Sequence, residues 1–402
     1  MPYDPAPIYL DHHATTPLDP AVTAAMLPWL AEFFANPHAR AHRTGWQAAE
    51  AVDDARGRIA ALIGAEEDEI VFTAGATEAN NLAIQGAVLA ELSAGGKRRR
   101  ILTLATEHPS VTGPVEAMAR LGFEPVILPV GPDGLVDPAQ VHAAVDDRTL
   151  LISVMALNNE IGVIQPVAEI ASMARAVGAL MHCDAVQAVG RTAPTLDGLG
   201  ADLVSLAAHK LYGPKGIGCL VVRRDARARI APILFGGGQE RGLRPGTLSP
   251  ALCVGFGAAA DRVAALGEAE PARVADLGRR LWRMLSARLG DGVALNGSVE
   301  DRHWSNLSLR FAGIRADRLP AALPDLVFSV GSACSSHRPA PSPVLTAIGL
   351  DAGQAASTIR IGLGRGTTEA DITTAGERLA AAVDLLRAEA ARPRWQSAAA
   401  AI

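Results

Sequence analysis

Short apolar runs alternate with amphipathic stretches through most of the chain before residue 250. Continuous apolar runs between turn residues are typical of buried strands, and apolar residues at helical spacing are typical of helices. The pattern predicts strands at residues 69–73, 101–105, 125–128, 150–155, 179–183 and 203–208. It predicts helices at residues 21–30, 46–63, 79–92, 111–121 and 167–177. Such alternation favours an α/β fold with a mainly parallel sheet covered by helices on both faces.

The alternation ends with two long helical patterns, at residues 251–266 and 268–289. Beyond them the pattern is that of a smaller α+β region, with strands at residues 307–311, 327–330 and 358–361 and helices at 316–323 and 369–389. We therefore expect three parts: an N-terminal segment (1–20) that packs with the small domain, a large domain (21–262) and a small C-terminal domain (263–402).

Length, charge and cysteine content narrow the class of protein. A chain of 402 residues can bury the cores of two domains, and a net charge of −5 does not favour nucleic-acid binding. No apolar run is long enough to span a bilayer, and the N-terminal sequence MPYDPAPIYLDHH does not resemble a signal peptide. We expect no metal site, because the adjacent His12 and His13 cannot easily share one ion, and His38 and His42, at helical spacing after a proline, lack an obvious third ligand. The chain has four cysteines, Cys183, Cys219, Cys253 and Cys334. Their spacing does not suggest disulfides, which favours a protein of the reducing cytoplasm.

The sequence ADLVSLAAHKLYGPKGIGC, residues 201–219, places Lys210 directly after an apolar run. A lysine at the end of a buried strand is poorly solvated, and burial disfavours its charged form. One interpretation is a lysine whose stem covers apolar surface while its amine reaches water. The other is an amine held for covalent chemistry with a carbonyl, as a Schiff base.

A second motif, GATE at residues 75–78, lies between a predicted strand and a predicted helix. A strand, a turn of small residues and a helix start with a threonine can bind a phosphate through free backbone N–H groups. The alternative is an ordinary capped helix.

Several polar residues follow the predicted strands directly. In a parallel sheet the carboxyl ends of the strands meet at one edge, where ligands bind. Each residue alone could be a cap or a turn residue, but their coincidence at one edge favours a site. The residues are Glu107, His108, Asn158, Asn159, Glu160, Asp184, Gln187 and Lys210.

Two irregular segments are candidates for function. The sequence GGGQERGLRPGT, residues 236–247, is either a flexible connector or a place where backbone approaches a ligand or another subunit. Cys334 lies in the loop GSACSSHRPAPSPV, with His337 nearby and few bulky apolar neighbours, which suits an accessible thiol. The other three cysteines lie in apolar contexts and are expected in the core.

Nine motifs occur in the order of one known family: YLDHHATTPLDP, FTAGATEANNLAI, TEHPSV, NNEIGVIQP, HCDAVQAVG, HKLYGPKGIG, GGGQERGLRPGTL, GSACSS and IRIGLGR. Together they resemble the cysteine desulfurases of the NifS/IscS type, pyridoxal-phosphate enzymes of the class V aminotransferase group. The likeness extends from Ile8 to about Leu386. It implies the PLP-dependent transferase fold type I and a homodimer.

The resemblance implies a role for each matching residue around pyridoxal 5′-phosphate. Lys210 would carry the cofactor, Asp184 would pair with its ring nitrogen, and His108 would stack on the ring and move protons. Gln187 would bind the phenolic oxygen, and Asn159 would lie beside the ring. The phosphate ligands would be Ala76, Thr77, His209 and Thr247, the last supplied by the partner subunit.

The resemblance also implies the reaction. Arg360 would bind the carboxylate of L-cysteine in a bidentate manner, with Asn36 and Asn159 as further substrate contacts. Lys210 would remove the Cα proton, and the Cys334 thiolate would take the sulfur as a persulfide while L-alanine is released. The sulfur would serve an acceptor protein in iron–sulfur cluster assembly or tRNA thiolation. Cys334 could also ligate an iron–sulfur cluster transiently.

Two departures from the family pattern stand out. Alanine is present at Ala207, where relatives carry a serine that binds the phosphate; we expect Ser205 or water to compensate. The C-terminal sequence RPRWQSAAAAI does not resemble the tail that binds a scaffold protein. The alternatives are a selenocysteine lyase or aminotransferase of the same fold and, least favoured, a non-enzymatic sulfur carrier or partner protein.

Overall fold

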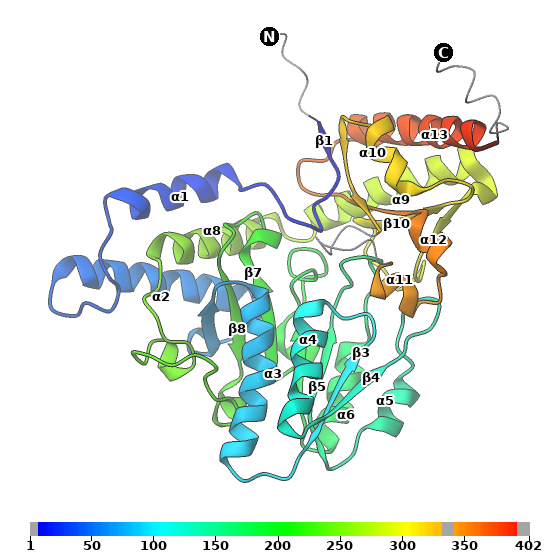
Figure 1. The fold of residues 1–402 in the computed structure, drawn as a ribbon. Coiled ribbons are helices and arrows are strands. Elements are labelled where there is room, and N and C mark those ends of the chain that lie inside the picture. The colour runs from blue at the N-terminus through cyan, green and yellow to red at the C-terminus, as the bar shows by residue number, and fades with distance from the viewer. Residues whose placement is uncertain (1–6, 332–340, 392–402) are drawn as a thin grey trace, which may run out of the picture.

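The structure is a computed structural model that describes residues 7–331 and 341–391 (Figure 1). Its centre is a seven-stranded sheet in the order β2-β8-β7-β6-β5-β3-β4. The strands are β2 (Ile70–Thr73), β3 (Arg100–Leu104), β4 (Glu124–Leu128), β5 (Thr149–Met155), β6 (Leu180–Asp184), β7 (Leu203–Ala207) and β8 (Gly218–Val222). Strand β8 runs antiparallel to both neighbours and the other pairings are parallel. The expected α/β fold with a mainly parallel sheet is confirmed.

Helices cover both faces of this sheet, because successive strand residues point to opposite sides. Phe72 and Val154 pack in one core with α2, α6 and α8, whereas Val71 and Leu151 pack in another with α3 and α4. Strands buried on both sides are nearly continuous apolar runs, which is why the sequence predicted six of these seven strands; β8 was missed. The helices are α1 (Pro20–Ala31), α2 (Arg43–Ile63), α3 (Ala76–Ser93), α4 (Pro109–Ala117), α5 (Pro138–Ala144), α6 (Val167–Ala176), α7 (Leu196–Leu199) and α8 (Pro250–Leu266).

Helix α8 packs closely on α1 and α2 because it carries two glycines at the contact. A Cβ atom at Gly257 would lie 2.7 Å from the Cα of Ala55, and one at Gly255 would lie 2.6 Å from the sulfur of Met26. Larger residues at these positions would therefore push the helices apart.

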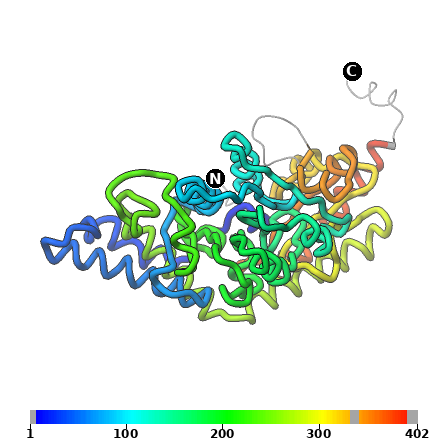
Figure 2. Tube along the Cα trace, turned by 90° about the horizontal axis from the view of Figure 1, so that it is seen from below, coloured from blue at the N-terminus to red at the C-terminus, as the bar shows by residue number. Residues whose placement is uncertain are grey.

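The C-terminal region forms a separate four-stranded antiparallel sheet in the order β12-β13-β10-β9. Its strands are β9 (Val293–Leu295), β10 (Asn306–Phe311), β12 (Ser329–Val330) and β13 (Thr358–Gly362). The helices of this region are α9 (Ala269–Leu289), α10 (Leu319–Ala322), α11 (Pro343–Ala347), α12 (Ala352–Ala356) and α13 (Glu369–Ala391). Figure 2 shows this region and the α1–α2 helices at opposite ends of the molecule.

The N-terminal strand β1 (Ile8–Tyr9) pairs in parallel with β11 (Leu326–Val327) of this C-terminal region. The single strand expected at residues 327–330 was wrong, because Val327 pairs with Tyr9 while Ser329 pairs with Arg360 in a different sheet. The boundaries at residues 20 and 262 stay predictions. In the described ranges, no helix combines the length and apolar content needed to cross a bilayer.

A buried ion pair anchors the glycine-rich segment 236–247 to the large sheet. Arg56 of α2 donates to both carboxylate oxygens of Glu240, at 2.8 and 2.9 Å, and the Phe72 amide also donates to Glu240 at 2.7 Å. The two side chains are only 7% and 2% exposed. Charges are stable at this depth only when they are paired and hydrogen-bonded. The segment is therefore not a free connector at Glu240.

Replacing Glu240 by alanine leaves the Arg56 guanidinium buried without its partner. We expect the free energy of unfolding to fall by about 3–5 kcal/mol, measured by urea denaturation. The matched control is Asp261→Ala, which removes the exposed pair with Arg58 and should cost less than about 1 kcal/mol. Equal losses in the two variants would contradict this role for Glu240.

Candidate active site

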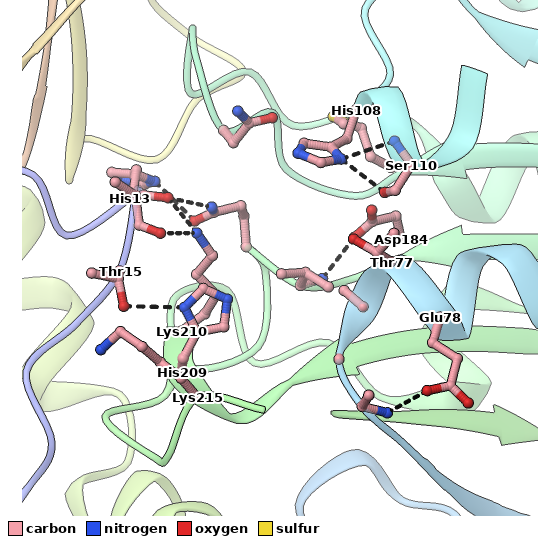
Figure 3. Close-up of a pocket in the computed structure, with 18 of the residues that line it drawn as sticks. His13, Thr15, Thr77, Glu78, His108, Ser110, Asp184, His209, Lys210 and Lys215 are labelled. Atoms are coloured by element: carbon pink, nitrogen blue, oxygen red, sulfur yellow. Dashed lines mark hydrogen bonds between the residues drawn. The ribbon is translucent and has the colours of Figure 1, made fainter. Parts of the chain in front are cut away.

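A cavity of about 1080 Å³ opens at the carboxyl ends of the parallel strands (Figure 3). Its wall is built by the end of β6, the start of α3, the loop before α4, the turn after β7 and strand β13. These elements bring together most of the residues that the sequence indicated: Ala76, Thr77, His108, Asn159, Asp184, Gln187, His209, Lys210 and Arg360. The polar residues that follow the strands in the sequence therefore do lie together at one edge of the sheet.

Three of the expected site residues that the structure describes are not in this wall. Ser205 is fully buried and its hydroxyl lies 2.9 Å from His182 Nε2, so the expectation that it compensates for Ala207 is not supported. Asn36 is an exposed turn residue that accepts a hydrogen bond from the His38 amide, which does not support a substrate contact in its own chain. Thr247 is exposed. Cys334 lies outside the described residues.

Lys210 follows β7 in a short 3-10 turn, Ala208–Lys210, and its amine faces two backbone carbonyls. Its Nζ donates to the carbonyl oxygens of His13 and Ala14, each at 2.6 Å. Burial, followed by the positive charges of Arg191 and Arg360, lowers the pKa of Lys210 to about 7. A neutral amine has two protons and one lone pair. The two carbonyls match those protons, and the lone pair stays available as a nucleophile.

The N-terminus of α3 forms another part of the wall, at Ala76 and Thr77. The preceding Gly75 has φ 152°, a conformation that favours glycine. A Cβ atom at Gly218 would lie 2.9 Å from the Cα of Gly75, so position 218 has no room for a side chain. Helix N-termini present free N–H groups and a partial positive charge, which suits an anion such as phosphate.

A hydrogen-bonded chain that the sequence reasoning missed joins Asp184 to His108. Asn80 donates to Asp184 Oδ2 at 2.9 Å and to Ser110 Oγ at 2.8 Å, and Ser110 Oγ lies 2.8 Å from His108 Nδ1. The second oxygen, Asp184 Oδ1, accepts from the Val186 amide at 3.1 Å. Both oxygens of Asp184 are therefore fixed in position. An asparagine inside a helix pattern gave no signal in the sequence, because its partners come from β6 and α4.

His108 is the N-cap of α4, and this role determines its protonation. The Ser110 amide, which can only donate, lies 3.1 Å from Nδ1, so Nδ1 is an acceptor. Burial, the largest influence, lowers the pKa of His108, with the charge of Lys210 acting in the same direction. The neutral ring therefore carries its proton on Nε2.

The N-terminal segment, residues 11–16, completes the wall on the side of Lys210. Gln187 Nε2 donates to the His13 carbonyl at 3.0 Å, and Gln187 Oε1 accepts from His13 Nδ1 at 2.9 Å. His209 Nδ1 lies 3.1 Å from Thr15 Oγ1, and burial lowers the pKa of His209 to about 4. The sequence pattern gave this segment no role beyond its motif, since its partners lie almost two hundred residues away in the chain.

The comparisons with known proteins agree with this geometry. A family model described as Aminotransferase class-V matches residues 8–374. The chain belongs to the class-V aminotransferase family. It is 44% identical over 381 residues to Cysteine desulfurase IscS of Rickettsia bellii, with 95% of this chain and 92% of that protein covered. It is 46% identical over 366 residues to Cysteine desulfurase IscS of an Anaeromyxobacter species, with 91% and 90% covered.

Solved structures of related proteins show the same fold. A NifS-like protein superposes with a TM-score of 0.85 at 30% identity, covering 94% of this chain and all of that chain. The structure described as SspA in complex with cysteine has a TM-score of 0.79 at 34% identity, with 89% and 99% covered. DndA from Streptomyces lividans has a TM-score of 0.76 at 36% identity, with 91% and 100% covered. The fold type expected from the sequence is confirmed.

The family's cofactor is pyridoxal 5′-phosphate, and the residues present fit it. The cofactor's aldehyde needs an unprotonated amine, which Lys210 supplies near neutral pH. Its phosphate needs an anion site, which the start of α3 supplies beside Gly75. Its ring nitrogen needs a carboxylate, and Asp184 lies in the same wall. Ala207, 2% exposed at the end of β7, has no hydroxyl to add to the phosphate site.

The lowered pKa of Lys210 predicts how its reaction with the cofactor depends on pH. Below about pH 7 the amine is protonated and cannot attack an aldehyde. The rate at which cofactor-free protein attaches pyridoxal 5′-phosphate should therefore rise with pH and level off above about 7. Borohydride trapping followed by peptide mass spectrometry measures attachment at Lys210. A midpoint near the ordinary lysine pKa of about 10.4 would contradict the assigned environment.

Proposed function

We propose that this chain is a pyridoxal-phosphate-dependent cysteine desulfurase that converts L-cysteine to L-alanine and carries the sulfur as a persulfide on Cys334. The observation that carries this proposal is the Lys210 amine, held by two backbone carbonyls with its pKa lowered to about 7, in one cavity with Arg360. The carboxylate of an amino acid substrate can pair with Arg360. Its amine can react with the cofactor's aldehyde, which would lie at Lys210. The similarity to chains named cysteine desulfurase supports the choice of L-cysteine over other amino acids.

The residues of the site divide the chemistry between them. We assign the phosphate to Ala76, Thr77 and His209, the ring nitrogen to Asp184, and the phenolic oxygen to Gln187. His108 and Asn159 lie beside the ring in this assignment. When bound, the cofactor withdraws electrons from the Cα atom of the amino acid.

Side chains of the protein carry out the proton transfers and the sulfur transfer. Lys210, unprotonated near neutral pH, accepts the proton from Cα, and His108 holds a proton at Nε2 for return. The Cys334 thiolate forms a bond to the substrate sulfur while the bond from that sulfur to Cβ breaks. A proton then completes the methyl group of L-alanine. The products, L-alanine and a persulfide, balance L-cysteine and one protein thiol without an external oxidant.

The other cysteines are unsuited to this step. Cys183, Cys219 and Cys253 are fully buried. Burial raises the pKa of Cys183 well above its usual range and raises that of Cys253 to about 12, so these thiols stay protonated. A protonated thiol is a poor nucleophile. This exclusion supports Cys334 as the sulfur acceptor.

Replacing Cys334 by alanine should leave attachment of the cofactor to Lys210 intact and abolish sulfide release from L-cysteine with a reductant. In the unmodified chain, mass spectrometry after exposure to L-cysteine should find one added sulfur, on the peptide that contains Cys334. Cys253→Ala is the matched control and should retain the activity. Sulfide release by Cys334→Ala at the original rate would overturn the role of Cys334. Formation of a keto acid in place of alanine would favour an aminotransferase.

We further infer a homodimer, since large apolar side chains are exposed along α1, directly after it, and at residues 234–235. Phe34 is 84% and Phe235 is 87% exposed, and exposed apolar groups of this size favour an interface. Thr247, exposed in its own chain, would complete the partner's phosphate site.

A reducing cytoplasm would suit the unpaired buried cysteines. Sulfur delivery to a protein of iron–sulfur cluster assembly or tRNA thiolation completes the proposal.

Phe34→Asp should convert the dimer to a monomer and weaken retention of the cofactor, because Thr247 of the second copy would be lost. Sedimentation equilibrium and the absorbance of bound cofactor measure the two effects. Val299→Asp, at another exposed apolar residue, is the control and should alter neither. A monomeric unmodified chain with full cofactor occupancy would refute the dimer.

A further inference from the structure

Arg360 is already paired with a carboxylate of its own chain. Its Nη2 donates to Asp11 Oδ1 at 2.8 Å, and the two side chains are 7% and 15% exposed. Both residues line the cavity in which the substrate carboxylate is expected. Asp11 comes from the N-terminal segment and Arg360 from β13, so the pair joins two distant parts of the chain.

The hydrogen bonds that Arg360 already makes leave no free pair of N–H groups with which it could bind a substrate carboxylate through two hydrogen bonds. The two Nη2 protons go to Asp11 Oδ1 and to Ser329 Oγ, the latter at 2.9 Å, and Nη1 donates to the Asn159 carbonyl at 3.2 Å. A guanidinium can bind a carboxylate with two hydrogen bonds through Nη1 and Nη2 or through Nε and Nη2. Both forks need an Nη2 proton. A substrate carboxylate can bind in a bidentate manner only if Asp11 or Ser329 yields its place.

The pair with Asp11 is also incomplete. Asp11 uses one oxygen for Arg360, while its other oxygen accepts from Ser329 Oγ at 2.9 Å. Among the described residues, the buried Nε of Arg360 has no hydrogen-bond partner. A buried donor without a hydrogen-bond partner destabilises the protein. A carboxylate that took the Nε–Nη2 fork would satisfy that donor, which Asp11 in this arrangement does not.

We propose that Asp11 occupies the position of the substrate α-carboxylate in the substrate-free protein and is displaced from Arg360 when an amino acid binds. This rests on the proposed function, specifically on Arg360 as the carboxylate ligand. Ser329 continues to bind Asp11 after displacement, so the released carboxylate keeps a partner. Asp11 is thus an internal competitor that keeps the buried Arg360 paired until substrate arrives and lowers the affinity for every α-carboxylate.

The test compares Asp11→Asn, which removes the charge and nearly preserves the shape, with Asp11→Glu, which keeps a carboxylate. The probe is L-alanine, the expected product, titrated into cofactor-loaded protein by calorimetry. Asp11→Asn should bind L-alanine about tenfold more tightly, whereas Asp11→Glu should not gain affinity. L-Alaninamide, which lacks the carboxylate, should bind both variants as it binds the unmodified chain. A gain confined to L-alanine and to Asp11→Asn would support displacement.

The opposite result would overturn the proposal. Unchanged or weaker L-alanine binding by Asp11→Asn would show that Asp11 supports Arg360 rather than competing for it. The negative charge of Asp11 raises the pKa of Lys210, so cofactor attachment to cofactor-free Asp11→Asn should have a lower pH midpoint. That shift verifies that the variant is folded with the charge removed. If Arg360→Ala leaves L-alanine binding unchanged, the carboxylate ligand is wrongly assigned; absent desulfuration with intact L-alanine binding would refute only the proposed function.

Discussion

The burial of one lysine amine is the constraint on which the rest of the structure depends. A protonated amine at Lys210 would be costly because most of its surroundings are protein and it lies near two other cations. The protein holds it instead between two carbonyl oxygens of the N-terminal segment. That segment must therefore be fixed with the accuracy of a hydrogen bond. Thr16 does this by donating to the His209 carbonyl and accepting from the Tyr212 amide.

The cost of burying a charge also determines the state of Glu107, an acidic residue near the site. Glu107 lies behind the cavity, fully buried, and accepts a hydrogen bond from the Met155 amide. Burial, with a smaller effect from Asp184, raises the pKa of Glu107 well above its usual range, which favours its protonated, neutral form. A neutral Glu107 adds no second negative charge next to Asp184. Asp184, held in place by Asn80 and Val186, can then present its carboxylate to a cationic ring.

Local pattern predicted the elements of this fold well, and distant pairing was where it failed. Most buried strands and the long helices were found because apolar runs and helical periodicity are local properties, although β8 was missed. The split of residues 327–330 between two sheets was missed, since it is decided by partners near Tyr9 and Arg360. Motif resemblance located Lys210, Asp184 and His108, but neither pattern nor resemblance revealed Asn80. Its role exists only after the fold brings β6 and α4 together.

The charge of the substrate carboxylate can alter the pKa of Lys210, the base that removes the Cα proton. Arg360 lowers the pKa of Lys210, whereas Asp11 and Asp184 raise it, so the balance of charge in the cavity sets the proton affinity of the amine. If an incoming α-carboxylate takes Arg360 and releases Asp11, the cavity gains one negative charge while Asp11 stays nearby. That gain raises the pKa of Lys210, because a negative charge favours the protonated amine. Once substrate has freed the Lys210 amine, that amine would then be a stronger base when a proton must leave Cα.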